Sequence, residues 1–169
     1  TIEDQLFVSE LYLKSGNLSK SNYFLQKAIT AAPQFPEVIF QRARYYAHSH
    51  DTSKAIDYYK QLLLKDSTHE RGILGFSAIL VQKQMPDSAL KLLSKTINSS
   101  DYLASVLVAR SLTLKSNVDS AMFWWGKALL KSPRLAEAHF QMADYYYHKG
   151  NYPSAKSHLA SMPENEHTL

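Results

Sequence analysis

The chain has 169 residues, and its 45% hydrophobic content is enough to bury a core without cross-links. It contains no cysteine, which excludes disulfides, thiolate catalysis and metal sites built on cysteine. With only 5 glycines, an all-β or glycine-rich nucleotide-binding fold is disfavoured, and the formal net charge of +4 is too small to indicate nucleic acid by itself.

The most informative feature of the sequence is an internal repeat. A small residue followed three positions later by a large one recurs at intervals of 34, 34, 32 and 34 residues, and the small residues are Ser9, Ala43, Ser77, Ala109 and Ala143. A second series of small residues shows the same four intervals, and its members are Ser21, Ala55, Ala89, Ala121 and Ala155. Two series that share one irregular interval are not a chance pattern. They define five repeats, which are residues 2–35, 36–69, 70–101, 102–135 and 136–169.

Each repeat predicts two helices of about 12–14 residues, because its apolar residues fall at helical spacing in two stretches. In the first repeat, Thr1 and Asp4 form a capping arrangement that begins the first helix. Gly16 suits the left-handed end of that helix, and the Asn17 side chain can accept from the free N–H groups that begin the second. Pro33 prevents the second helix from continuing.

The later repeats follow this plan with one exception. The side chains expected to cap their second helices are Asp51, Asn117 and Asn151. The third repeat has Met85 at this position, places Pro86 in the first turn of the helix and is two residues short. We expect the deletion between Thr96 and Tyr102, where the turn into the fourth repeat should be tight or irregular.

This pattern resembles the tetratricopeptide repeat family, a 34-residue helix–turn–helix unit with small residues at positions 8 and 20, large residues at 11 and 24, and proline at 32. The fourth repeat carries the family residues Ala109, Leu112, Ala121, Trp125 and Pro133. The resemblance covers essentially the whole chain. It implies an all-α fold in which residues 1–169 form a single right-handed α-solenoid of antiparallel helix pairs, with the first helices lining a concave groove.

The resemblance also implies a binding site, because ligands of the family most often lie in this groove and contact positions 2, 5, 9 and 12 of the first helices. The candidate groove residues are Leu6, Glu10, Leu13, Phe40, Arg44, Arg71, Leu74, Val106, Arg110, Phe140, Asp144 and Tyr147. Position 5 is apolar in all five repeats, Arg44 and Arg110 lie near the middle, and carboxylates lie toward the ends. Such a surface suits a partner peptide or amphipathic helix with apolar and acidic side chains. The alternative is that the position-5 side chains pack against adjacent helices and are only partly exposed.

Other chemistries find little support. The family's carboxylate clamp for chaperone tails would keep only the charge of Arg71. His48, His50 and Asp51 span a turn without further ligands at fixed spacing, so no metal is expected. No nucleophile with a base and no phosphate loop is recognisable, so we expect no catalytic residue, no cofactor and no small-molecule substrate. The paired aromatic residues are expected in the core, with Tyr147 as the exception that projects into the groove.

The favoured interpretation is therefore a non-enzymatic scaffold or adaptor that binds another protein, within an assembly or biogenesis complex. The alternative is a structural module that self-associates or joins a longer array through an uncapped end around Tyr152, Leu159 and Met162, since residues 162–166 end the last helix and no capping helix follows. A nucleic-acid scaffold is less favoured, because the lysines are dispersed over second helices and turns.

The sequence leaves the compartment open. No apolar run reaches the roughly 18–20 residues that span a bilayer, so no transmembrane segment is expected. The chain begins at Thr1, which suggests a processed chain or a piece of a longer protein. A cytoplasmic and a bacterial-envelope location are both compatible with it.

Overall fold

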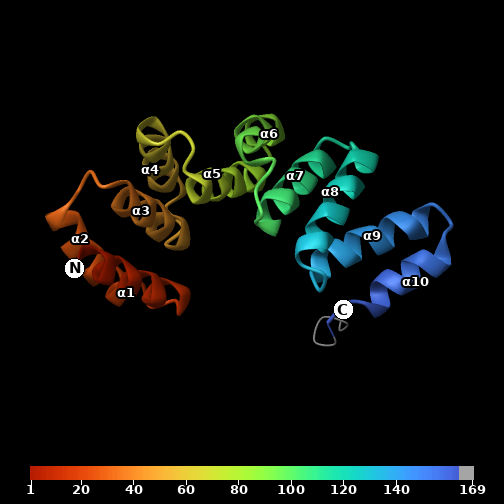
Figure 1. Cartoon of the computed structure of the whole chain (residues 1–169), viewed down its shortest axis with the longest axis horizontal. Coiled ribbons are helices and arrows are strands. Elements are labelled where there is room, and N and C mark those ends of the chain that lie inside the picture. Colours follow the sequence, from red (N-terminus) through yellow and green to blue (C-terminus); the bar gives the residue numbers. More distant parts are fainter. Residues whose placement is uncertain (164–169) are drawn as a thin grey trace. The chain divides into compact units, whose positions relative to one another are not determined.

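The computed structural model describes residues 1–163, and this part of the chain is helical without any β-strand (Figure 1). In chain order its helices are α1 (Ile2–Lys14), α2 (Leu18–Ala31), α3 (Pro36–His48), α4 (Thr52–Lys65), α5 (Glu70–Gln82), α6 (Pro86–Leu93), the 3₁₀ helix η1 (Ser94–Thr96), α7 (Tyr102–Leu114), α8 (Val118–Lys131), α9 (Ala136–His148) and α10 (Tyr152–Ala160). The prediction of an all-α fold is confirmed. None of the helices within residues 1–163 combines the length and the apolarity needed to cross a membrane. The end of the fifth repeat, residues 164–169, lies outside the described residues, including Glu164, Asn165 and Glu166 of the expected stop.

Helices pack in pairs that follow the repeats: α1 on α2, α3 on α4, α7 on α8 and α9 on α10. The chain divides into two compact units, an N-terminal unit (Thr1–Ile79) and a C-terminal unit (Leu80–Leu169), and α5 runs across their boundary. Each unit is described by itself. The single array over residues 1–169 stays a prediction.

Outside the third repeat, the capping residues and glycines begin and end the helices as the sequence predicts. Asp4 N–H donates to Thr1 Oγ1 at 3.1 Å, which completes the expected capping box. The side chains that cap α2, α4, α8 and α10 are Asn17, Asp51, Asn117 and Asn151. Gly16 and Gly150 adopt positive φ angles of 76° and 74° between the helices of their repeats. Caps and turns depend on neighbouring residues alone, which is why local sequence predicts them.

The small residues of both series lie at the contacts between paired helices. All ten side chains are buried. Ser9 Oγ donates to the Ser21 carbonyl at 2.9 Å across the α1–α2 contact. Ala121 is fully buried in a cluster with Ala109 and Trp125. A larger side chain at these positions would separate the helices, so the short residue sets their distance.

The third repeat departs from the plan earlier than expected. Its second helix α6 ends at Leu93, and the chain continues as the 3₁₀ turn η1, Ser94–Thr96. The irregularity therefore begins before the predicted position between Thr96 and Tyr102. The reason is that the helix itself is shortened to 8 residues, whereas α2, α4 and α8 have 14 each.

Candidate binding surfaces

Charged side chains from α1, α3 and α5 meet on one face of the N-terminal unit. Glu10 lies at the centre, and its carboxylate is 2.9 Å from the Arg44 guanidinium and 3.1 Å from the Lys14 ammonium. Arg71 approaches the same carboxylate at 3.6 Å. The Gln41 amide also donates to it, at 3.2 Å. One carboxylate thus joins three successive first helices.

This arrangement controls the ionisation of Glu10. Burial raises the pKa of the Glu10 carboxyl, but hydrogen bonds from Lys14 and Arg44 and their positive charges outweigh it and hold the pKa at about 2. Glu10 is therefore ionised throughout the physiological range. Its charge is already compensated by the protein.

Phe40 lies beneath the charged layer. The Arg71 guanidinium is 4.5 Å from the centre of its ring and the Arg44 guanidinium 5.6 Å. The His69 ring centre is 5.1 Å away, and Arg71 is held by an ion pair of 3.0 Å to Glu37. Arg71 of α5 and His69, which precedes that helix, thus cover a ring of α3 that sequence reasoning placed in the groove.

The structure corrects the predicted apolar strip. The side chains of Leu6, Leu13, Phe40, Leu74 and Val106 are only 2–4% exposed. They pack in the core, as in the clusters of Leu6 with Leu25 and of Val106 with Trp125. The expectation that these side chains form an exposed strip is wrong. The alternative interpretation, in which they pack against adjacent helices, is the one that the structure supports. The predicted groove residues that are exposed are Arg71, Arg110, Phe140, Asp144 and Tyr147.

The arginines expected to meet an acidic partner are paired within the chain. Arg44 binds Glu10, as described above. Arg110 binds Glu137 through two hydrogen bonds, of 2.7 Å from Nε and 2.5 Å from Nη2. The hydrogen bond to Glu137 raises the pKa of Arg110, so the guanidinium stays charged.

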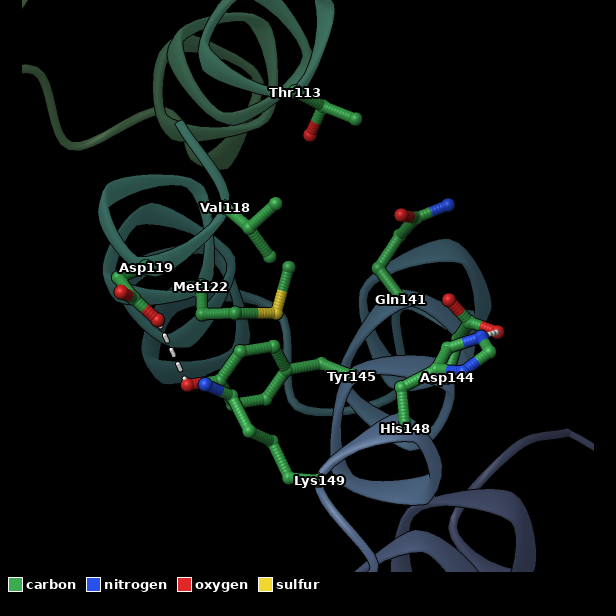
Figure 2. Close-up of a pocket in the computed structure, with 9 residues that line it drawn as sticks. All are labelled: Thr113, Val118, Asp119, Met122, Gln141, Asp144, Tyr145, His148 and Lys149. Carbon is green, nitrogen blue, oxygen red and sulfur yellow. Dashed lines mark hydrogen bonds and ion pairs between the residues drawn. The ribbon is translucent and has the colours of Figure 1, made fainter. Parts of the chain in front are cut away.

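A pocket of about 520 Å³ lies between α7, α8 and α9 in the C-terminal unit (Figure 2). Val118 and Met122 of α8 project into it, opposite Gln141 of α9 (Figure 2). Tyr145 of α9 donates its hydroxyl hydrogen to Asp119 at 2.9 Å and closes one wall. The remaining lining residues are Thr113, Asp144, His148 and Lys149. One wall of the pocket is therefore apolar and the facing one polar.

A second hollow of about 320 Å³ adjoins the pocket, because Thr113 and Gln141 line both. The Arg110–Glu137 pair and Trp125 line its other side. The indole N–H of Trp125 is buried and has no hydrogen-bond partner among the described residues. The two hollows together form a groove across the C-terminal unit, which we call the α7–α9 groove.

Sequence reasoning missed most of the residues of this groove. The family positions led to Arg110 and Asp144 but not to Gln141 and Tyr145, which lie on the adjacent face of α9. Val118 and Met122 come from a second helix, which the concave-surface rule does not consider. No sequence signal pointed to Val118, because an isolated exposed apolar residue is normal on a protein surface and Leu18 and Tyr152 follow their caps in the same way.

The expected oligomer end is only partly exposed. Tyr152 and Leu159 are exposed, whereas Met162 is half-buried. Leu159 and Tyr147 line a shallow hollow of about 190 Å³ with Phe140. Within residues 1–163, no three His, Asp or Glu side chains gather in a way that would hold a metal.

Comparisons with known proteins show the fold. No protein-family model and no curated protein sequence matches the chain. PilF of Pseudomonas aeruginosa matches with a TM-score of 0.88 at 16% identity, over 95% of this chain and 74% of PilF. PilW, a widely conserved type IV pilus biogenesis factor, matches with a TM-score of 0.85 at 13% identity, over 99% and 79%. The TPR protein TTC0263 of Thermus thermophilus matches with a TM-score of 0.78 at 18% identity, over 99% and 93%. The chain therefore has the tetratricopeptide repeat fold that its sequence pattern resembles.

Proposed function

We propose that the chain is a non-enzymatic adaptor that binds an extended segment of a partner protein in the α7–α9 groove. The observation that carries this proposal is the pocket of about 520 Å³ that continues, past Thr113 and Gln141, into the second hollow. Its apolar wall of Val118 and Met122 suits one aliphatic or aromatic side chain of the partner. The scaffold role in general agrees with the proteins that share the fold.

Gln141 is placed to recognise the partner's backbone. Its amide has no hydrogen-bond partner among the described residues, and it lies where the two hollows meet. A glutamine amide offers a donor and an acceptor side by side, which matches the C=O and N–H of a peptide group. We infer that Gln141 fixes the backbone while the pocket takes the side chain.

The acidic side chain expected in the partner has a weaker basis. A partner carboxylate would compete with Glu137 for Arg110, and with Glu10 and Glu37 for the arginines of the N-terminal unit. Displacing an internal carboxylate exchanges one ion pair for another and brings little net gain. We therefore propose that the apolar anchor, not an acidic group, carries the affinity.

Preorganisation provides the mechanism. The groove is built on α7, α8 and α9, with Val81 and Gln82 at the end of α5 also lining its second hollow. Its walls are fixed by the Tyr145–Asp119 and Arg110–Glu137 hydrogen bonds. Only the partner segment then loses conformational freedom on binding. The relation to PilW suggests an assembly or biogenesis machine as the setting, and this context is a proposal by analogy of fold.

A random peptide library selected on the purified chain tests the proposal. We expect the selected peptides to share one apolar anchor and to lose at least about tenfold in affinity on Val118→Glu, which places a charge in the pocket. A carboxylate in the first turn of α8 also suits the helix dipole, so this variant should keep its fold.

Leu130→Glu is the matched control, because Leu130 lies on the same helix and is exposed outside the groove. It should leave the affinity unchanged. Peptides that bind the Val118→Glu chain as tightly as the natural one would show that the α7–α9 groove is not the binding site.

A further inference from the structure

The first and the last repeat each expose an apolar surface at positions where neighbouring repeats pack on one another. Inside the N-terminal unit, Leu6 of α1 and Leu25 of α2 are covered by Val38 and Tyr45 of the next first helix, α3. In the C-terminal unit, Val106 and Trp125 are covered in the same way by Ala138 of α9. A repeat thus presents positions 5 and 24 of its helix pair to the first helix of the repeat that follows.

The last repeat presents the same two positions without a described neighbour. Phe140 and Leu159 occupy positions 5 and 24, and they are 42% and 45% exposed. Their counterparts Leu6, Leu25 and Trp125 are at most 4% exposed. Phe140 and Leu159 line the hollow of about 190 Å³ together with Tyr147 and Ala155. We call this surface the C-terminal face.

The first repeat exposes apolar side chains on its first helix, α1. Phe7 and Leu11 of α1 are 63% and 49% exposed. In the second repeat the position of Leu11 is held by Tyr45, which packs on the Leu6–Leu25 cluster. In the third repeat the position of Phe7 is held by Gly75, whose Cα lies so close to the buried Tyr59 that an added Cβ would be 2.3 Å from its hydroxyl oxygen. Phe7 and Leu11 therefore stand at the positions that contact a preceding repeat, and we call them the N-terminal face.

We propose that the N-terminal face of one copy of the chain docks on the C-terminal face of a second copy. A second copy is the occupant that the chain itself supplies, because each molecule exposes positions 5 and 24 of its last repeat and also exposes Phe7 and Leu11, apolar side chains at first-helix positions that elsewhere in the chain pack on a preceding repeat. Phe7 and Leu11 would cover Phe140 and Leu159, so that apolar surface meets apolar surface and the hollow is filled. The two faces differ, so the contact is head to tail and leaves a free half at each end of the assembly.

A complementation experiment tests this geometry. Phe7→Lys blocks the N-terminal face and Leu159→Lys the C-terminal face, and both substitutions are on exposed helix positions that tolerate lysine. Light scattering should show a mass that rises with concentration for the natural chain and a constant monomer mass for each variant alone. An equimolar mixture of the two variants should double in mass, since each retains the half that the other lacks.

Leu64→Lys, at an exposed position of α4 outside both faces, is the matched control and should self-associate like the natural chain. Circular dichroism of each variant should match the natural chain. A natural chain that stays monomeric at all concentrations, or variants that associate alone as well as the natural chain does, would overturn the proposal. A mixture that stays monomeric while the natural chain associates would do so too, because another contact would then be responsible.

Discussion

At the scale of single residues, Gly75 shows how a missing side chain shapes the N-terminal unit. A Cβ at this position would lie 2.3 Å from Tyr59 Oη, and Tyr59 is itself only 3% exposed. Phe76 stacks on the Tyr59 ring with centres 6.2 Å apart, and Phe40 packs at 6.5 Å. Burial raises the pKa of Tyr59 to about 12, so the phenol stays neutral. Tyr59 cannot move aside without disturbing two other rings.

We expect Gly75→Ala to destabilise the chain by about 1–3 kcal/mol through overpacking, although alanine is the better helix former. Gly126→Ala is the matched control, because Gly126 lies within α8 and an added Cβ would meet nothing within 4 Å. There the same substitution should stabilise by about 0.5–1 kcal/mol. Urea unfolding of both variants measures the difference, and equal signs would contradict the close approach at Gly75.

At the scale of elements, the turns inside the repeats differ in strain. Gly16 and Gly150 adopt positive φ without cost, whereas His50, Gln84 and Ser116 adopt φ angles of 61°, 56° and 58° at the equivalent place. A side chain in this region costs about 1–2 kcal/mol. The third turn also lacks a capping side chain, since Met85 makes no such hydrogen bond.

Gln84→Gly should therefore raise the free energy of unfolding by about 1 kcal/mol. Ser88→Gly, which lies within α6 and not in the turn, should lower it by about 0.5 kcal/mol, because glycine is the poorer helix former. Thermal unfolding followed by circular dichroism distinguishes the two. A lower melting temperature for Gln84→Gly would count against strain in this turn.

A histidine pair joins α9 and α10. His139 Nε2 lies 3.0 Å from the Pro133 carbonyl, which can only accept, so this nitrogen carries the hydrogen. His139 Nδ1 then accepts from His158 Nδ1 at 3.1 Å. The His158 ring also stacks on Tyr146, with centres 5.6 Å apart. Burial, and then the charge of His139, lower the pKa of His158.

Because the folded pKa of His158 lies below its unfolded value of about 6.5, folding favours the neutral ring, and stability is lost as the pH falls below that value. We expect the melting temperature to drop between pH 7.5 and pH 5.5 and expect His158→Phe, which keeps the stacking on Tyr146, to remove most of the drop. Glu10 does not interfere, because its contribution is lost only below its unfolded pKa of 4.5. An unchanged pH dependence in His158→Phe would assign the effect elsewhere.

At the scale of the whole molecule, function depends on which surfaces the repeats leave uncovered. The first four repeats bury positions 5 and 24, and the last repeat exposes them. Most charged side chains near the predicted groove form ion pairs within the chain, such as Arg44 with Glu10 and Arg110 with Glu137. We propose the α7–α9 groove as the site for a partner and the pair of terminal faces as the site for another copy.

The sequence by itself determined the helix pairs, their caps and the small residues at their contacts. These features depend on residues within one repeat, as Asn17, Ala55 and Gly150 show, so periodicity and capping chemistry are sufficient to predict them. It also singled out Tyr147 among the paired aromatic residues, and the structure leaves this ring exposed.

Only the tertiary structure decided which first-helix side chains are exposed. Phe40 is covered by Arg71 and His69, which lie about one repeat further along the chain. Arg44 is neutralised by Glu10 from the preceding repeat. The burial and the ion pairs of these side chains depend on residues of the adjacent repeat. The sequence pattern of a single repeat does not say which residues those are.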